Sequence, residues 1–455
     1  MCYDIAIVGG GPGGYTAAHE AARRGRSVVL FEASLLGGTC LNRGCIPTKA
    51  LIHAAQAYAD MRGAGGLGIT CEAASYDFAA MHARKDDVVA RLRTGVERLM
   101  HDDGTCVVHG HAQVGTGGTV TCAGETFEAG DVILATGAQP SRIPVTGFDL
   151  AGVGTSDDLL EGASLDVRSI VIIGGGVIGV ECAQIYANLG CRVTIIEAME
   201  RILPPMDREI SQRVTMLLKR CGVTIETKAR VCAITGEPGD MAVTYADKQG
   251  KVLEARGEAV LLATGRKAAT EGLFEPGAEP VLERGAVVTN AAGLTSIPHL
   301  YAIGDVRAHT IQLAHVAAAQ ARNVVAVICG EKPPVDEAVV PSCVYTSPEV
   351  ASVGRTADEA KAAGFSVRCT KQVVGANAKC LVEGSEMGYV KLVCDETTGQ
   401  VLGAQLVCPR ATDLVAELAL AIHLGATAED VAATIHPHPT VSEMVMDAAQ
   451  AYQAE

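Results

Sequence analysis

Residues 5–14 read IAIVGGGPGG, and this stretch decides the fold. The apolar run 5–8 predicts a buried parallel strand, residues 15–24 an alanine-rich helix, and residues 28–32 a second strand that ends in Glu32. The spacing Gly-x-Gly-x-x-Gly is formed by Gly9, Gly11 and Gly14. Such glycines allow a tight turn, close approach of the backbone to a pyrophosphate and close helix packing. The stretch therefore predicts a Rossmann-like dinucleotide site, with Glu32 placed to accept hydrogen bonds from ribose hydroxyls.

The same unit recurs between residues 170 and 197. Residues 170–173 form an apolar strand, residues 180–189 predict a helix, and a strand at 193–196 leads into Glu197. The glycines of this second loop are Gly174, Gly176 and Gly179. Each acid follows its last glycine at the same distance, since 197 − 179 = 18 and 32 − 14 = 18. One such loop is weak evidence, but two with strand, helix and acid predict that the chain binds two dinucleotides.

The acid of the second unit favours NAD over NADP. A carboxylate at Glu197 would repel a 2′-phosphate, which needs Arg or Lys. Residues 198–200 add no positive charge, and Arg201 is the first basic residue that could oppose this choice.

Further apolar strands predict how the rest of the chain is divided. Residues 132–137 and 259–265 both lead into a Thr-Gly pair, and residues 299–305 end at Asp305, as expected for a doubly wound sheet. Beyond residue 332, short β runs such as residues 386–392 and 401–407, together with helical stretches at 412–424 and 441–452, predict an α+β unit without a glycine loop. The expected fold is α/β, with two Rossmann-like dinucleotide-binding domains and a C-terminal α+β domain. The expected boundaries are 1–141 with 271–335 for the first domain, which is split, 142–270 for the second and 336–455 for the third.

Cys40 and Cys45 lie just beyond the first loop, in the run GGTCLNRGCIPTK at residues 37–49. A zinc site would need a second ligand pair, which the neighbouring sequence lacks, and a structural disulfide is disfavoured in a reducing cytosol. Pro47 suits a first helical turn, so Cys45 is expected at a helix N-terminus, where the dipole stabilises a thiolate. Lys49, one turn further on, could strengthen that thiolate, pair with an acid, or be a solvated surface lysine. The pair is predicted to be a redox-active disulfide with Cys45 facing the cofactor, and no metal is expected.

A thiol–disulfide relay also needs a base, and the run HPHPTVSE at residues 436–443 offers one. His436 and His438 are stiffened by prolines, and Glu443 is available to orient an imidazole. A solvated loop histidine is the simpler alternative. The run begins 396 residues after Cys40 (436 − 40 = 396), so the sequence cannot bring the two together.

Composition makes several classes of partner unlikely. The net charge of −15 and pI near 5.3 disfavour a polyanion-binding surface, because phosphate contacts need clustered Lys and Arg. The apolar stretches are broken by glycines and acids, and the N-terminus lacks the features of a signal peptide. We therefore expect a cytoplasmic protein that binds neither nucleic acid nor membrane. Of the 16 cysteines, the fourteen outside the pair are expected to be buried small apolar residues.

The chain resembles the pyridine nucleotide-disulfide oxidoreductases over essentially its whole length. The resemblance rests on the two glycine loops, the run 37–49, and residues 135–137, 302–305, 341–349 (PSCVYTSPE) and 436–443, in this order. The Cys-x-x-x-x-Cys run and the His-Pro-x-x-Ser-Glu ending are highly specific. The resemblance implies an enzyme that oxidises a protein-bound dihydrolipoyl group and passes hydride through the thiol pair and FAD to NAD+. Such an enzyme would serve a 2-oxo acid dehydrogenase or glycine cleavage complex.

The resemblance also implies roles for individual residues. Cys40 would be the interchange thiol that meets substrate and Cys45 the thiol that contacts the flavin. In a homodimer, His438, held by Glu443, would act as base and acid at the disulfide of the partner subunit. Lys49 and Glu181 would form an ion pair beside the flavin ring. FAD would be held by Gly9, Gly11, Gly14, Glu32 and Asp305, and NAD by Gly174, Gly176, Gly179 and Glu197. Lys49, Thr136, Gly137, Gly265, Leu313, Ala314 and His315 complete the expected cofactor-binding set.

The sequence leaves some alternatives open. Arg43 stands where many relatives have a small apolar residue, and it could shift the potential of the thiol pair or simply project into solvent. Another NAD(P)H-dependent disulfide reductase of the same family is one alternative. Glutathione-type reductases prefer NADPH, which Glu197 opposes, and the C-terminal cysteine pair of mercuric reductases is absent here. A non-catalytic dinucleotide-binding redox sensor is an alternative of another class. No lipoyl-like segment precedes Tyr3, so the lipoyl group is expected in trans, on a lipoyl domain or carrier protein.

Overall fold

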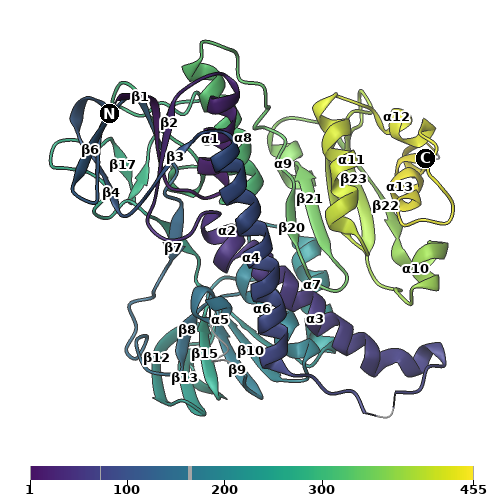
Figure 1. The fold of residues 1–455 in the computed structure, drawn as a ribbon. Helices are drawn as coiled ribbons and strands as arrows, with labels where there is room; N and C mark the ends of the chain where they lie inside the picture. Colours follow the sequence, from purple (N-terminus) through teal and green to yellow (C-terminus); the bar gives the residue numbers. More distant parts are fainter. Residues whose placement is uncertain (1, 72, 162–165, 454–455) are drawn as a thin grey trace.

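The first of three units contains the N-terminal glycine loop (Figure 1). The computed structural model describes residues 2–71, 73–161 and 166–453. The sheet of this unit has the order β3-β2-β1-β6-β5-β4, with β19 beside β6. Its strands are β1 (Cys2–Val8), β2 (Val28–Glu32), β3 (Cys106–His109), β4 (Ala112–Val114), β5 (Thr119–Cys122), β6 (Glu125–Leu134) and β19 (Leu300–Ala302). Its central strands are parallel and covered on both faces, which explains the unbroken apolar run at residues 5–8, each at most 4% exposed.

Helices place the thiol pair at the edge of the first unit. The α1 helix (Pro12–Arg23) packs on α8 (Ala314–Ile328), and α3 (Cys45–Gly63) packs on both α4 (Phe78–Asp102) and α6 of the second unit. A short helix that the sequence did not predict, α2 (Gly38–Arg43), precedes α3 and contains Cys40. Short 3₁₀ turns complete the unit: η1 (Ala64–Leu67), η2 (Thr116–Gly118) and η3 (Gly304–Val306).

The second unit repeats the nucleotide fold. Its five-stranded parallel sheet has the order β11-β10-β9-β15-β8. The strands are β8 (Val153–Thr155), β9 (Ser169–Ile173), β10 (Arg192–Glu197), β11 (Thr224–Thr227) and β15 (Ala259–Leu262). The helices are α5 (Ser156–Glu161), α6 (Val177–Asn188) and α7 (Arg208–Arg220). An antiparallel sheet of β12 (Arg230–Glu237), β13 (Asp240–Ala246) and β14 (Val252–Gly257) accompanies them.

The chain passes between the first two units through paired strands. Strand β7 (Ala138–Pro140) leaves the first unit and pairs antiparallel with β16 (Arg266–Ala268), where the chain returns. A small hairpin of β17 (Leu282–Glu283) and β18 (Ala286–Val287) follows. This crossing is consistent with the predicted split first domain, whose boundary positions remain predictions.

The third unit is α+β. Its antiparallel sheet has the order β20-β21-β24-β23-β22. The strands are β20 (Ser342–Val344), β21 (Val350–Gly354), β22 (Val367–Val373), β23 (Tyr389–Asp395) and β24 (Val401–Val407). The helical segments are α9 (Ala357–Ala362), η4 (Val374–Ala376), α10 (Ala378–Val382), α11 (Ala411–His423), α12 (Ala428–Ala433) and α13 (Glu443–Gln453). The α11 and α13 helices share one apolar core with the sheet.

The predicted starts of both nucleotide-loop helices were three residues late. The α1 helix begins at Pro12 rather than residue 15, and α6 begins at Val177 rather than residue 180. Gly11 and Gly176 are the extended residues that precede the first turns, and the fixed φ of Pro12 suits a first helical position. The last glycine of each motif therefore lies inside its helix.

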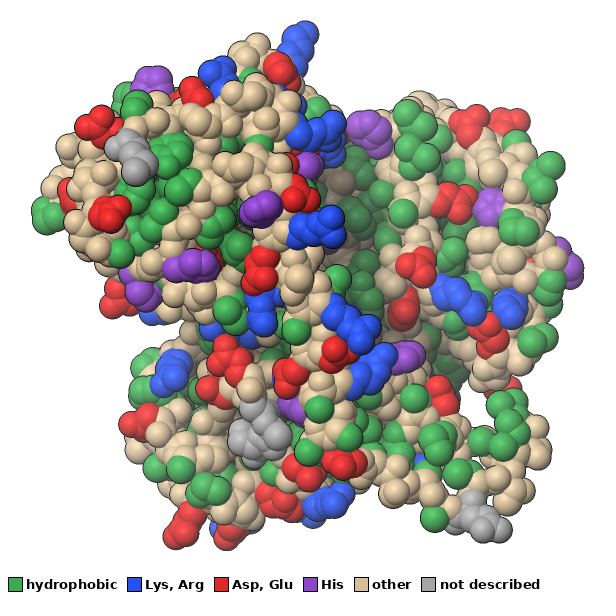
Figure 2. Space-filling view, in the orientation of Figure 1, with side chains coloured by type: hydrophobic (Ala, Val, Ile, Leu, Met, Phe, Trp, Pro, Cys, Tyr) green, Lys and Arg blue, Asp and Glu red, His purple; other side chains and the backbone are tan. Residues whose placement is uncertain are grey.

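Two features of the fold are relevant to what the protein can bind. Among the described residues, no helix combines the length and apolarity needed to cross a bilayer. Figure 2 shows a face that is hollowed where the first and third units meet, with apolar side chains inside the hollow.

Candidate active site

One large cavity joins both glycine loops to the two cysteines. Its volume is about 1640 Å³, above the roughly 300–1,000 Å³ of ordinary small-molecule sites. The predicted site residues that line it are Gly9, Gly11, Glu32, Cys40, Cys45, Lys49, Thr136, Gly137, Gly174, Gly176, Glu181, Glu197, Gly265, Asp305, Leu313, Ala314 and His315. Gly14, Gly179, His438 and Glu443 are not among its lining residues. Folding thus brings most of the predicted site to one place.

The glycines of the first loop divide into two kinds. A Cβ on Gly9 would overlap the carbonyl group of Ala135, and a Cβ on Gly14 would overlap the carbonyl of Gly9. A Cβ on Gly11 would meet only the Cα of Gly38, at 3.8 Å. The outer glycines are therefore needed for chain packing, whereas the middle glycine keeps space open at the cavity wall.

The second loop repeats this division. A Cβ on Gly174 or Gly179 would overlap a backbone carbonyl, and one on Gly176 would meet nothing within 4 Å. No side chain caps the N-terminus of α1 or α6. Uncapped amides beside open space at the start of a helix form an anion site, so both loops fit a dinucleotide pyrophosphate.

The two predicted ribose-binding acids are also structural. Glu32 is 9% exposed and accepts one backbone N–H at each oxygen, from Gly10 and Ser34, both at 2.7 Å. Glu197 is 7% exposed and accepts from Gly175 and Met199, both at 2.6 Å. A carboxylate oxygen has a second lone pair, so each acid can still accept a ribose hydroxyl.

Arg201 does not provide a phosphate site in the cavity. Its Nη2 donates to the carbonyls of Pro204 at 2.9 Å and Met206 at 3.2 Å. It is not a lining residue, whereas Glu197 is. The geometry is therefore consistent with NAD as the exchanging nucleotide.

The thiol pair sits between two helices at the cavity wall. Cys40 lies in α2, and Cys45 is the first residue of α3, as the sequence predicted. A hydrogen bond from the Cys40 thiol, with help from the Lys49 ammonium, lowers the pKa of Cys45 to about 7 against the effect of burial. The same hydrogen bond, together with burial, raises the pKa of Cys40. In the reduced pair, Cys45 is thus the more acidic thiol and Cys40 the less acidic one.

Lys49 and Glu181 form the predicted ion pair. Lys49 Nζ lies 3.0 and 2.8 Å from the two carboxylate oxygens, and the Glu181 side chain is only 4% exposed. Tyr345, which is not among the predicted site residues, donates its backbone N–H to Glu181 at 3.0 Å. The Tyr345 ring lies 4.5 Å from Lys49 Nζ, within range of a cation–π contact. All three units therefore meet at this ion pair.

The two histidines of the C-terminal run have different environments. His436 is 4% exposed in its side chain, and its Nε2 lies 2.9 Å from Glu417. His438 is 72% exposed, with Nδ1 2.9 Å from Glu443 Oε1. The N–H of Thr440 and the contact with His438 lower the pKa of Glu443. The exposed His438 has the carboxylate partner expected of a base, and it lies outside the lining of its own chain's cavity.

Several predicted cofactor residues also make contacts within the chain. Thr136 Oγ1 donates to the carbonyl of Ala269 at 2.8 Å, and His315 Nε2 lies 2.8 Å from the carbonyl of Pro341. Burial raises the pKa of Asp305, partly offset by Arg266. Gly137 and Gly265 have φ of +71° and +97°, a backbone conformation that is unfavourable for residues other than glycine.

Two expectations from the sequence need correction. Arg43 does not simply project into solvent: it contacts Asp157 and Glu161 of α5 and lines the cavity. The remaining cysteines are not uniformly buried, since Cys2, Cys71, Cys221, Cys232 and Cys369 are exposed. A cysteine in an apolar sequence neighbourhood can still face outward where an edge or loop is left uncovered.

The described residues contain no group of three or more His, Cys, Asp or Glu side chains arranged to hold a metal ion.

Family models and curated relatives both match this chain over nearly its whole length. A family model described as pyridine nucleotide-disulphide oxidoreductase matches residues 3–321, and the dimerisation domain of that family matches residues 340–449. A dihydrolipoyl dehydrogenase of Bacillus subtilis is 40% identical over 99% of this chain and 98% of its own length. One of Thermus scotoductus is 39% identical, over 99% and 97%.

Solved structures have the same fold. The flavoprotein disulfide reductase RclA of Escherichia coli, as a Cu(II) complex, has a TM-score of 0.88 at 29% identity, covering 99% of both chains. LpdA of Mycobacterium tuberculosis has a TM-score of 0.89 at 27% identity, covering 98% of this chain and 99% of its own.

Proposed function

The chain belongs to the pyridine nucleotide-disulphide oxidoreductase family, and we propose that it oxidises protein-bound dihydrolipoyl groups with NAD+ as the final acceptor. The curated relatives named dihydrolipoyl dehydrogenase support this substrate. The observation that carries the proposal is the thiol pair, which lies in the same cavity as both nucleotide loops. A dithiol beside two dinucleotide sites is suited to accepting an electron pair from a dithiol substrate.

The protein uses FAD and NAD, and its residues fit both. The first loop, with Gly9, Gly11, Gly14, Glu32 and Asp305, would hold FAD. The second, with Gly174, Gly176, Gly179 and Glu197, would hold NAD. Bound FAD supplies an acceptor for the electron pair of the reduced thiols and a hydride donor to NAD+.

The pKa difference between the cysteines supports their separate roles. A substrate thiolate that attacks Sγ of Cys40 breaks the Cys40–Cys45 bond and releases Cys45 as the leaving thiolate. Thiols of lower pKa leave faster, and the pKa of Cys45 is lowered to about 7. The second substrate thiol then attacks the substrate sulfur of the mixed disulfide, which forms the lipoyl disulfide and releases Cys40 to take a proton. The substrate loses two electrons, and the cysteine pair gains them.

The proton transfers require a base, and we assign this role to His438. Its Nδ1 contact with Glu443 fixes the ring and leaves Nε2 to take a proton from the substrate thiol. His438 is exposed and outside the cavity lining of its own chain, so a homodimer in which it reaches the partner's cavity would complete the site. The match to a dimerisation domain supports a homodimer. Exposed apolar side chains of the third unit, Leu420, Leu424 and Ile435, are consistent with such an interface.

The lipoyl group is proposed to arrive on a lipoyl domain or carrier protein in trans. A cytoplasmic location would provide both a reducing environment for the cysteines and access to 2-oxo acid dehydrogenase or glycine cleavage complexes.

A steady-state assay of the purified holoenzyme tests the proposal. Dihydrolipoamide is offered with NAD+ or NADP+, and oxidised glutathione with NADPH as the comparison. We expect rapid NAD+ reduction, much slower NADP+ reduction and no glutathione reduction. Failure to reduce NAD+ with dihydrolipoamide would overturn the proposed substrate.

A further inference from the structure

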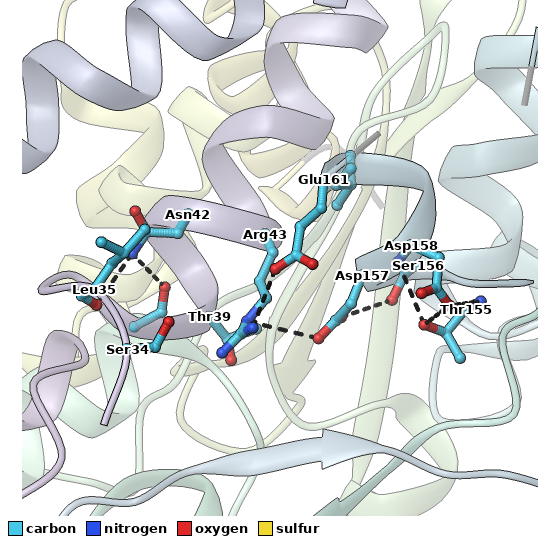
Figure 3. A network of polar contacts seen from close by, with 12 residues as sticks. Ser34, Leu35, Thr39, Asn42, Arg43, Thr155, Ser156, Asp157, Asp158 and Glu161 are labelled. Atoms are coloured by element: carbon cyan, nitrogen blue, oxygen red, sulfur yellow. Dashed lines mark hydrogen bonds and ion pairs between the residues drawn. The ribbon is translucent and has the colours of Figure 1, made fainter. Parts of the chain in front are cut away.

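Arg43 lies between the two cysteines in sequence and is held by acids of the second unit (Figure 3). Its Nε lies 3.7 Å from Asp157 Oδ2, and its Nη1 lies 3.1 Å from Glu161 Oε1. The other oxygen of Asp157 lies 3.0 Å from Nη1 of Arg266. One carboxylate is therefore shared by two guanidinium groups that come from different units.

The two acids that contact Arg43, Asp157 and Glu161, differ in how far they are buried. The Asp157 side chain is 17% exposed and Arg266 is 12% exposed, whereas Glu161 is 56% exposed. Solvent screens an exposed pair much more than a half-buried one. Asp157 is thus the acid whose charge matters most to Arg43.

The local structure fixes both Asp157 and Arg266. Asp158 caps the start of α5 by accepting from the N–H and Oγ1 of Thr155 at 2.7 and 2.8 Å, so the helix that contains Asp157 has a defined start. Nη2 of Arg266 donates to the carbonyl of Ala138 at 2.8 Å and lies 3.4 Å from Oγ1 of Thr39, the residue before Cys40. The pair therefore forms a fixed surface against which α2 rests.

We propose that Asp157 is a positioning residue that holds α2, and with it Cys40, through Arg43 and Arg266, and that neutralises the arginine charge beside the thiol pair. This role rests on the proposed function in one respect only: it assumes that Cys40 and Cys45 are the redox-active pair. Arg43 and Asp157 would then set the reactivity of the pair from the second nucleotide unit.

The net charge of the side-chain cluster around Asp157 determines the direction in which each substitution should shift the pKa of the thiol pair. Two arginines and two carboxylates make the cluster of Arg43, Arg266, Asp157 and Glu161 neutral. Asp157→Asn leaves it with a charge of +1, which favours thiolates, and Arg43→Met leaves it with −1, which disfavours them. The double variant is neutral again. Three other ionisable groups act on the thiol pair: Lys49, Glu181 and Tyr15. They are unchanged in the wild type, the two single variants and the double variant.

The experiment measures how thiol alkylation depends on pH. The reduced holoenzyme is treated with iodoacetamide from pH 5.5 to 9, and alkylation of the peptide containing Cys40 and Cys45 is quantified by mass spectrometry, so the exposed cysteines do not interfere. We expect Asp157→Asn to shift the midpoint down by about 0.5 pH unit, Arg43→Met to shift it up by a similar amount, and the double variant to return to the wild-type midpoint. Because α2 also moves, kcat/KM for dihydrolipoamide should fall roughly tenfold in Asp157→Asn.

Matched controls separate charge from general damage. Glu161→Gln removes an exposed acid that contacts the same arginine, and its shift should be much smaller than that of Asp157→Asn. Arg93→Met loosens α2 from its other side, where Arg93 Nη1 donates to Asn42 at 3.3 Å, and should leave the midpoint unchanged. If Asp157→Asn does not fold, the upward shift of Arg43→Met still tests the proposal.

An unchanged midpoint in both single variants, or a shift that persists in the double variant, would overturn the proposed role. Neither result depends on lipoamide, so failure here is distinguishable from failure of the proposed substrate.

Discussion

At the residue scale, the cysteines differ because of what surrounds them. The Cys40 thiol donates a hydrogen bond to Cys45, which also lies near the Lys49 ammonium and is the first residue of a helix. A helix N-terminus and a nearby cation both stabilise a thiolate. Two identical side chains five positions apart therefore have opposite pKa shifts.

Lys49 provides a test of this difference. Lys49→Met removes the ammonium and leaves the Glu181 carboxylate uncompensated, so both changes raise the pKa of Cys45 above about 7. We expect the alkylation midpoint of Cys45 to move to higher pH by roughly one unit. Lys49→Arg keeps the charge and should retain most of the thiolate. A midpoint in Lys49→Met equal to that of the wild type would show that the ammonium does not contribute.

At the scale of elements, the two strand–loop–helix units are nearly identical in their contacts. In each, the first and last glycines lie against a backbone carbonyl, and the acid of the second strand accepts N–H groups from the loop. The loop therefore keeps its shape through its own backbone and acid, and the middle glycine is left to face the nucleotide.

Two alanine substitutions in the second loop should have different effects. Gly176→Ala adds a Cβ in open space beside the cavity, so we expect weaker NADH binding, by roughly tenfold, with an unchanged melting temperature. Gly179→Ala drives a Cβ into the carbonyl of Gly174, so we expect a loss of about 1–3 kcal/mol in the free energy of unfolding. Fluorescence titration and calorimetry measure the two quantities. Equal destabilisation by both variants would contradict the assigned roles.

At the scale of the whole molecule, the proposed base, His438, and the thiol pair lie in different parts of the chain. The cavity contains residues from all three units, yet His438 is exposed beyond it. The proposed homodimer resolves this separation by pairing each cavity with the partner subunit's His438.

Mixed dimers test the shared site. Cys40→Ser and His438→Gln homodimers should each lose activity with dihydrolipoamide, the latter by about 10²–10⁴-fold. Heterodimers with one subunit of each kind, purified by two different tags, should regain about half the wild-type activity, because one of their two sites combines an intact Cys40 with an intact His438. No recovery in heterodimers of normal stability would place the base and the thiols in the same subunit.

Prediction from sequence succeeded where the constraint is local. The strands at residues 5–8 and 170–173, both glycine loops and the helix that starts at Cys45 follow from turn geometry and side-chain pattern within a few residues. It failed where a neighbour distant in sequence decides the structure. Strands β20, β21 and β22 went unpredicted, because these short strands are fixed by pairing rather than by their own pattern: β21 pairs with β24, β22 with β23, and β20 with β21.

The sequence by itself determined the two nucleotide loops and the acids that follow them, because backbone sterics and hydrogen bonds within a loop act over one or two turns. Only the tertiary structure decided that Arg43 meets Asp157, that Tyr345 covers Lys49, and that His438 rather than His436 is exposed. These contacts depend on how the three units dock. Docking is set by the fit of whole surfaces, which no short run of residues encodes.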